Sequence, residues 1–376
     1  ERKETPLPPV CQGAARVRAL LKQLIDRECA LPDGSVDFLG QPDHEFLINL
    51  LQIASAFQNV HVRQILCFDN SPRAAAENVR MFSRILPALL SVSNYEAFYY
   101  YGSLDGVHSG ISPFPILLLT SSGALQIQAD YSAAILSTGP AYRLLRAHFE
   151  NALSDCRPLV RRVRDLTGCL QNYQPFWEKI QRDEQEQFYY LVPEYSCTAF
   201  LDREILETAL LSELPGREQL VEALAAGSTQ SLKGVLEYPL TQYITREGVL
   251  SFLRTGRFSD CPDAFYHPLE PAHRARILER SIACARESES YQLHLYDHDA
   301  LPFSDALTLT ASAEGQAVNI NCKLRTSGFL SLILQEPTVS AAIVDYLSSL
   351  LDTPAVASKE ETLQWLEEAL TVFRRS

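Results

Sequence analysis

The chain has 376 residues, of which 46% are hydrophobic and 21% are charged, a composition typical of a globular protein rather than a disordered one. Its 33 basic and 46 acidic residues give a formal net charge of −13, and no domain carries a basic stripe, which argues against direct nucleic-acid binding by these residues. No apolar run approaches the roughly 18 residues that a membrane-spanning helix needs.

The cysteines and the methionine bear on the compartment and on the start of the chain. There are nine cysteines, an odd number with no C-x-x-C pair, and Cys67 and Cys284 lie in apolar stretches. This pattern fits reduced thiols in a cytoplasmic protein better than a disulfide framework or a zinc site. Because Met81 is the single methionine, we expect the natural protein to begin upstream of Glu1.

The first 155 residues are predicted to form a linker and one α/β unit. Residues 1–40 are charged and proline-rich before a stretch with helical spacing of apolar residues. Residues 41–155 then alternate between helical and extended patterns, and Pro87 should kink or split one of the helices. The predicted elements are helices over 15–29, 43–58 (capped by Asp43), 71–92 and 140–153, strands over 61–68 and 95–102, and a hairpin over 116–128 with a Ser-Ser-Gly turn.

Residues 156–270 are predicted to be a mainly helical insertion, and residues 271–376 a second α/β unit. In the insertion, Pro215-Gly216 separates two helices, Thr245 caps a third, and 188–200 is an extended interruption. The elements predicted for the second unit are helices over 273–288, 337–351 and 358–375, a strand over 291–297 and a hairpin over 306–320.

The order of elements in the second unit repeats that of the first. Tyr95 corresponds to Tyr291, Gly123 to Gly315 and Pro140 to Pro337, at a nearly constant offset. Mixed α/β domains often alternate elements in this way, so chance similarity is the alternative explanation. We predict a mixed α+β fold of two related helix–strand–hairpin–helix units, with a natural binding site in the cleft between the halves.

Two stretches resemble the C-terminal regions of bacterial, Firmicute-type helix-turn-helix transcriptional regulators. They are "FPILLLTSSGALQIQADYSAAILSTGPAYRLLRAHFENAL" (114–153) and "GFLSLILQEPTVSAAIVDYLSSLLDTPAVASKEETLQWLEEAL" (328–370), in which "SKEETLQWL" is the most recognisable piece. The resemblance implies that the chain is the effector and dimerisation region of such a regulator, and that a DNA-binding domain lies upstream.

The hairpin-then-helix unit is also similar to one half of a phospholipase D-like fold. Catalytic members of that family carry H-x-K-x4-D on the strand that enters the hairpin. Here the corresponding strands read "PFPILLLT" (113–120) and "DALTLT" (305–310), and no H-x-K occurs in the chain. The resemblance therefore implies a degenerate phospholipase D-like fold that is non-catalytic and serves as a sensor.

Aromatic residues and histidines supply the candidate ligand-binding residues. On a strand, Tyr99 and Tyr101 point to the same side, which is either core or the lining of a pocket. In "HLYDHD" (294–299), His294 and His298 would share a face with Tyr296, but a third metal ligand is missing, so we predict no metal site. The candidate ligand-binding residues are Tyr99, Tyr101, Tyr131, His294 and Tyr296.

The closing helix, 358–375, begins with a capping box of Ser358 and Glu361. Its apolar stripe of Leu363, Leu366, Leu370 and Phe373 either docks on the core or forms a dimer contact. We predict a cytoplasmic homodimer that senses a small-molecule or peptide effector, needs no cofactor, does not bind membranes and reaches DNA only through an upstream domain. The alternatives are a protein–protein interaction domain without a ligand, and a hydrolase with an unrecognised site, although G-x-S-x-G and P-loop motifs are missing.

Overall fold

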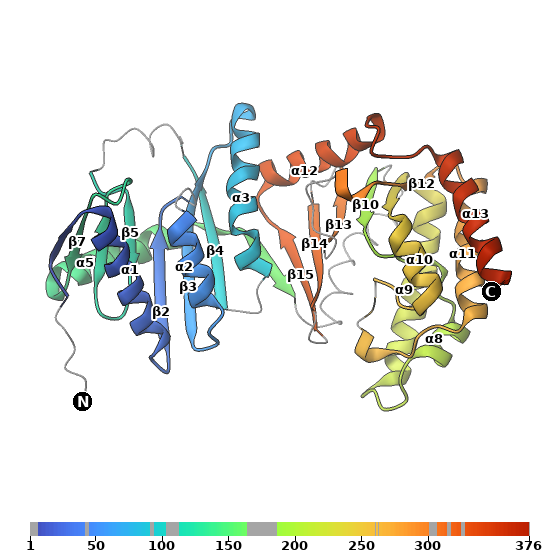
Figure 1. Cartoon of the computed structure of the whole chain (residues 1–376), viewed down its shortest axis with the longest axis horizontal. Helices are drawn as coiled ribbons and strands as arrows, with labels where there is room; N and C mark the ends of the chain where they lie inside the picture. Colours follow the sequence, from blue (N-terminus) through green and yellow to red (C-terminus); the bar gives the residue numbers. More distant parts are fainter. Residues whose placement is uncertain are drawn as a thin grey trace. The chain divides into compact units, whose positions relative to one another are not determined.

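A computed structural model describes residues 7–41, 45–90, 94–102, 113–163, 186–259, 261, 263–300, 307–313, 317–324 and 328–375. The chain divides into two compact units, Glu1–Arg161 and Arg162–Ser376, here called the first and second units. Each unit is built on one mixed β-sheet that carries helices (Figure 1). The predicted mixed α+β class is therefore confirmed.

The sheet of the first unit has three parallel strands followed by an antiparallel meander. Its strand order is β1-β7-β6-β5-β2-β3-β4-β8. The strands are β1 (Val10–Gln12), β2 (Gly34–Leu39), β3 (Val60–Phe68), β4 (Asn94–Tyr101), β5 (Ile116–Leu119), β6 (Ala124–Ile127), β7 (Ala133–Ser137) and β8 (Arg157–Pro158). The helices are α1 (Ala14–Cys29), α2 (Glu45–Ser55), α3 (Ala75–Leu90) and α5 (Gly139–Ser154). Figure 1 shows α1 and α2 in front of this sheet.

The sheet of the second unit follows the same plan, in the order β12-β11-β10-β13-β14-β15-β9. Its strands are β9 (Val160–Val163), which spans the division between the units, β10 (Phe188–Val192), β11 (Leu240–Ile244), β12 (Tyr291–Leu295), β13 (Leu307–Ser312), β14 (Ala317–Leu324) and β15 (Gly328–Leu334). Its helices are α8 (Arg203–Ala209), α9 (Arg217–Glu237), α10 (Arg246–Thr255), α11 (Pro271–Glu287), α12 (Pro337–Ser349) and α13 (Lys359–Arg375).

The predicted repetition of elements is present in the topology. Taken in chain order, β1 to β7 and β9 to β15 occupy the same seven places in their sheets. A pair of buried side chains is repeated as well: the Tyr95 hydroxyl donates to Gln64 Oε1 (2.5 Å), and the Tyr291 hydroxyl donates to Gln242 Oε1 (2.7 Å). The predicted correspondence of Tyr95 with Tyr291 thus has a physical basis, whereas Gly315 lies outside the described residues.

The division between the two units, after Arg161, lies close to the predicted boundary at 155, whereas the predicted boundaries at 40 and 270 fall inside the units. Strands β10 and β11 lie within 156–270, but they pair with β12 and β13 in one sheet. This segment therefore supplies two central strands and is not an insertion. Both strands are five residues long, and β11 has buried side chains on both faces, so it lacks the alternation that marks a half-buried strand.

Local signals placed the starts of α9 and α10 correctly. Gly216 adopts a left-handed conformation before α9, and the Thr245 hydroxyl accepts the Gly248 N–H at the start of α10. Pro87 does not split its helix, because α3 continues to Leu90. Pro87 lies in the last turn, where the missing N–H removes one hydrogen bond. Asp43, the predicted cap of α2, lies outside the described residues.

The two faces of the second sheet carry different helices. The Tyr243 hydroxyl donates to the Leu347 carbonyl (2.7 Å), which places α12 on one face. On the other face, Ile244 and Leu293 join a hydrophobic core with residues of α8, α9, α10, α11 and α13. The apolar stripe of α13 belongs to this core, since Leu366 is fully buried. A dimer would therefore have to use a different surface.

The Ser-Ser-Gly hairpin of the first unit is held by a buried carboxylate. Glu28, at the end of α1, is completely buried, and its Oε1 accepts the Ser121 N–H (3.0 Å) and hydroxyl (2.6 Å). Its Oε2 accepts the Ser35 N–H (3.0 Å) of β2. Glu28 thus ties the turn to the first parallel strand, and these contacts account for the turn serines structurally.

Candidate functional site

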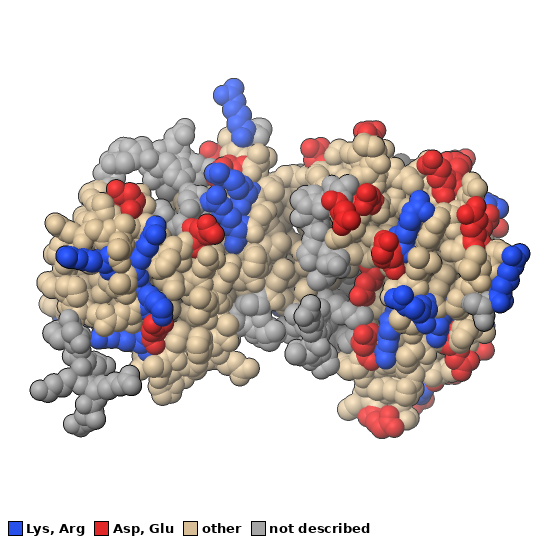
Figure 2. Space-filling model, viewed as in Figure 1, with Lys and Arg blue, Asp and Glu red and all other residues tan. Residues whose placement is uncertain are grey.

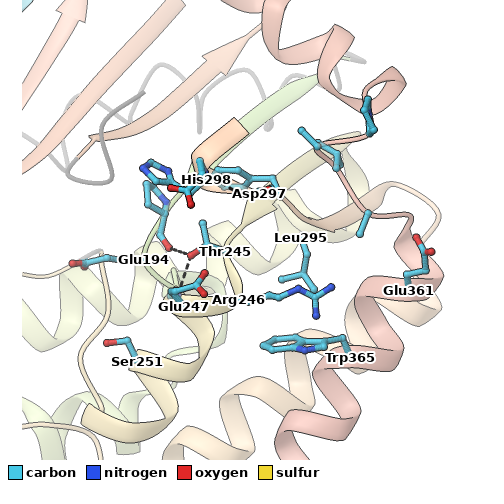
Figure 3. Close-up of a pocket in the computed structure, with 18 of the residues that line it drawn as sticks. Glu194, Thr245, Arg246, Glu247, Ser251, Leu295, Asp297, His298, Glu361 and Trp365 are labelled. Carbon is cyan, nitrogen blue, oxygen red and sulfur yellow. Dashed lines mark hydrogen bonds between the residues drawn. The ribbon is translucent and has the colours of Figure 1, made fainter. Parts of the chain in front are cut away.

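A pocket of about 1170 Å³ opens in the second unit at the carboxyl ends of the parallel strands β10, β11 and β12 (Figure 3). This is the edge of an open α/β sheet at which ligands commonly bind. Segments distant in sequence line it: Pro193–Glu194, the start of α10, Leu295–Asp299, Pro354–Ala357 and one face of α13. We call it the strand-end pocket.

The floor of the pocket is fixed by the first turn of α10. The Thr245 hydroxyl donates to the Pro193 carbonyl (2.5 Å) and accepts the Gly248 N–H (2.9 Å), as Figure 3 shows. A Cβ atom at Gly248 would lie 2.2 Å from the Pro193 oxygen, so only glycine fits here. The loop after β10 and the start of the helix after β11 are therefore locked together.

One wall is the connection between α12 and α13, which pairs with the end of β12. The Ala357 N–H donates to the Leu295 carbonyl and the Asp297 N–H donates to the Ala355 carbonyl, each at 2.8 Å. The His294 ring, behind this wall, donates from Nδ1 to the Ala357 carbonyl (2.9 Å). These hydrogen bonds hold residues 354–357, a turn at 354–355 followed by the bridge residue Val356, along the pocket.

The opposite wall is a face of α13. Glu361, Gln364, Trp365 and Glu368 recur at the spacing of one helical face and line the pocket. The predicted capping box is confirmed, because Glu361 Oε2 accepts both the Ser358 N–H (2.9 Å) and the Ser358 hydroxyl (2.8 Å). These hydrogen bonds lower the pKa of Glu361, so it stays charged at neutral pH.

A stacked pair of side chains crosses the pocket. The Arg246 guanidinium, in the first turn of α10, lies over the Trp365 ring at 5.0 Å from its centroid (Figure 3). A guanidinium in this position is attracted by the negative face of the indole. Arg246 also lowers the pKa of Glu361, after the larger effect of the Ser358 hydrogen bonds.

The lining is rich in carboxylates, in keeping with the charge of the second unit. Residues 1–161 hold 14 basic and 15 acidic residues, whereas residues 162–376 hold 19 and 31, so most of the net charge belongs to the second unit. Figure 2 shows many carboxylates on the visible face of this unit. The pocket is lined by Glu194, Glu247, Asp297, Asp299, Glu361 and Glu368.

Two of the five predicted ligand-binding residues lie in or near this pocket. Tyr296 lines it, and its ring lies 6.2 Å from that of His298. His294 is 7% exposed and lies behind the wall rather than in the pocket. Burial lowers the pKa of His294, so the ring is neutral near pH 7 and its Nε2 has no hydrogen-bond partner among the described residues.

The other three predicted residues lie in the first unit, where Tyr99 and Tyr101 are in ring contact and Tyr131 lies apart from them. Tyr99 is buried on β4, and its ring packs edge-on against Phe68 (5.8 Å) and Tyr101 (5.5 Å). Tyr131 is 5% exposed beyond β6, which is separated from β4 by the three strands β5, β2 and β3, and burial raises its pKa to about 12. Its ring packs edge-on against Phe46, and Arg18 lies over both rings.

Sequence reasoning missed most of the pocket, although two signals in it were visible. Thr245 stood out as a helix cap, and "SKEETLQWL" stood out within the closing helix. Neither signal indicates that the two segments meet, because α10 and α13 are separated by about a hundred residues of chain.

The described residues offer neither a metal-binding cluster nor the phospholipase D-like motif. No group of three or more His, Cys, Asp or Glu side chains in this part could hold a metal ion. The eight cysteines described are free thiols. The strands that correspond to the phospholipase D-like motif, β5 and β13, carry neither His, Lys nor Asp. No helix of the described chain is long and apolar enough to cross a bilayer.

Comparisons with known proteins add little. No family model and no curated protein matches the sequence. A polyphosphate kinase from Porphyromonas gingivalis is similar in structure at a TM-score of 0.30 and 12% identity, over 96% of this chain and 55% of that one. The archaeal chromatin protein TrmBL2, described with a novel mode of DNA binding, is similar at a TM-score of 0.26 and 10% identity, over 42% of this chain and 57% of that one. Likenesses this weak assign neither a family nor an activity.

Proposed function

We propose that this chain is the ligand-sensing effector region of a cytoplasmic bacterial transcriptional regulator. The observation that carries the sensing role is the strand-end pocket, a concave site of ligand size whose walls come from several separate segments. The regulatory role rests on the resemblance of residues 114–153 and 328–370 to regulator effector regions. The repeated fold without an H-x-K motif supports a sensor, in degenerate phospholipase D-like halves, over an enzyme.

The walls of the pocket suggest how binding would be transmitted. α10 contributes Arg246, while the segment 354–357 and α13 form walls of their own. A ligand that contacts these elements together would bind one arrangement of them more tightly than another. This difference in affinity would shift the equilibrium between the two arrangements towards the one that binds better. α13 is packed against α11 and β12, so a change in its position would reach the core of the second unit.

We assign the contact with DNA to a domain upstream of Glu1. We also propose that the active form of the regulator is a homodimer. The net charge of −13 opposes binding of these residues to a polyanion. Dimers are also the usual form of regulators that read palindromic sites.

The test begins with the coding sequence immediately upstream of the Glu1 codon. We expect it to encode a helix-turn-helix domain; an initiator methionine directly before Glu1 would contradict the regulator role. The natural full-length protein is then used to select its DNA site, and the affinity for that site is measured with and without a pocket ligand. An unchanged affinity at saturating ligand would contradict the sensing role. That result would favour a protein–protein interaction domain.

A hydrolase remains the second alternative, and the pocket allows a direct check of it. A hydrolase should turn over ester or phosphoester reporters, and an alanine substitution at His298 or Glu247 should abolish the turnover. A sensor should show no turnover while still binding a ligand.

A further inference from the structure

We propose that the strand-end pocket binds a small organic cation, and that Arg246 occupies the place of this cation in the unliganded protein. The inference rests on the proposed sensing function and names the class of its ligand. It starts from the pocket itself and from the stacking of Arg246 on Trp365, not from the acidic residues alone.

The stacked pair shows that the pocket accepts a cation in a defined position. The Arg246 guanidinium is held 5.0 Å from the centre of the Trp365 ring, and Glu361 at the base of the same wall interacts with it. An aromatic face beside a carboxylate is the arrangement by which proteins bind guanidinium and ammonium groups of ligands. Arg246 is exposed and begins a helix, so its side chain can swing away without disturbing the backbone.

Three of the other carboxylates in the lining are not engaged with a cation of the described chain. Among the described residues, Glu247, Asp299 and Glu368 form no ion pair, although all three line the pocket. Arg246 and His298 are the basic side chains of the described lining, against six carboxylates. A lining with this excess of negative charge attracts cations and repels organic anions.

The test uses agmatine, which carries a guanidinium and an ammonium group, as the probe. Binding is measured by calorimetry at constant ionic strength and by Trp365 fluorescence in a W177F background, since the chain has two tryptophans. We expect saturable binding with a change in Trp365 emission. Arg246→Gln should tighten binding about threefold to tenfold, because it removes the internal competitor for the ring.

Matched variants separate the pocket from general charge. Glu247→Gln and Trp365→Leu should each weaken agmatine binding at least about fivefold. Asp345→Asn, an exposed carboxylate on α12 outside the pocket, removes the same charge and should leave binding unchanged. Equal losses in Glu247→Gln and Asp345→Asn would overturn the proposal, because they would indicate unspecific attraction.

A parallel titration with the organic anion glutarate distinguishes the two levels of the argument. Suppose that glutarate binds, that Trp365→Leu weakens this binding, and that agmatine does not bind. The proposal of a cationic ligand is then wrong, but the sensing function stands. If neither probe binds and a broad metabolite library also fails to stabilise the protein, the sensing function falls as well. Agmatine binding that Arg246→Gln weakens would contradict the role of Arg246 as an internal stand-in.

Discussion

The two units share a strand order but differ in how the last helix is fastened to the sheet. Aligned by their Tyr–Gln pairs, Asp37 of β2 corresponds to Tyr189 of β10, and Arg63 of β3 to Thr241 of β11. Six residues after the prolines of their first turns, α5 has Arg146 and α12 has Ile343. The first unit therefore adds ion pairs to the apolar packing of Phe149 and the hydroxyl contact of Tyr142, whereas the second unit docks its helix through apolar contacts and hydroxyl groups.

The ionic arrangement centres on a buried carboxylate. Asp37 is 1% exposed and accepts Arg63 Nε (2.7 Å) and an Arg146 amino group, while Arg63 also bonds Glu150 (2.7 Å). These bonds raise the pKa of Arg63, so it remains charged. The same topology therefore accepts either ionic or uncharged side chains at equivalent positions of the sheet, as long as each buried polar group has a partner.

The largest expected effect comes from removing the buried charge of Asp37 in the first unit. Asp37→Asn leaves Arg63 and Arg146 facing a neutral group and should destabilise the first unit by about 3–5 kcal/mol. The matched variant Tyr189→Phe removes one hydroxyl contact and should cost about 1 kcal/mol or less. Denaturant unfolding, with hydrogen exchange to assign the loss to β2 and β3, measures both. Equal costs would show that the two faces are held alike.

The shared feature of the two units predicts equal effects. Tyr95→Phe and Tyr291→Phe each leave a buried glutamine oxygen without its donor, so each should destabilise its unit by about 1–3 kcal/mol. The decreases in the free energy of unfolding that the two substitutions cause should agree within about 0.5 kcal/mol. A large effect in one unit and none in the other would mean that the repeated pair is not equivalent.

A glycine that only the pocket unit requires gives the next test. Gly248→Ala would bring a methyl group against the Pro193 carbonyl and should cost about 1–3 kcal/mol, with a loss of ligand binding. Gly227→Ala, in α9, meets no atom within 4 Å and should instead stabilise the unit by about 0.5–1 kcal/mol. Thermal unfolding separates the two signs, and a destabilising Gly227→Ala would contradict the assignment of open space.

The smallest effect is a pH dependence specific to the second unit. Because burial lowers the pKa of His294, the unfolded chain takes up a proton at a higher pH than the folded chain. Stability should therefore decrease as the pH falls below about 6.5, by no more than about 1.4 kcal/mol per pH unit. Lys359 and Glu360 of α13 and Tyr243 of β11 surround the ring. His294→Gln should flatten this slope relative to the natural protein, and identical slopes would exclude His294 as its source.

Patterns with a local cause could be predicted from the sequence. The apolar spacing of α1, the Thr245 cap and the Ser358–Glu361 box depend on neighbours a few residues away. The strands β2, β7, β11 and β15 were not predicted from the sequence. Some of them lack a simple alternation of apolar and polar residues, and others are short segments between turns. Most of the pocket was missed because pairing between distant strands decides which ends meet.

The outer parallel strand of each sheet is shielded from further pairing. In the first unit β8 covers β4, with Tyr99 opposite Arg157. In the second unit an isolated bridge between Tyr296 and Val356 covers the end of β12. An open strand edge can pair with a strand of another chain. In both units part of this edge is already paired within the chain, so fewer of its backbone groups are open to such pairing. We therefore expect the protein to resist aggregation through these edges and to associate through side-chain surfaces.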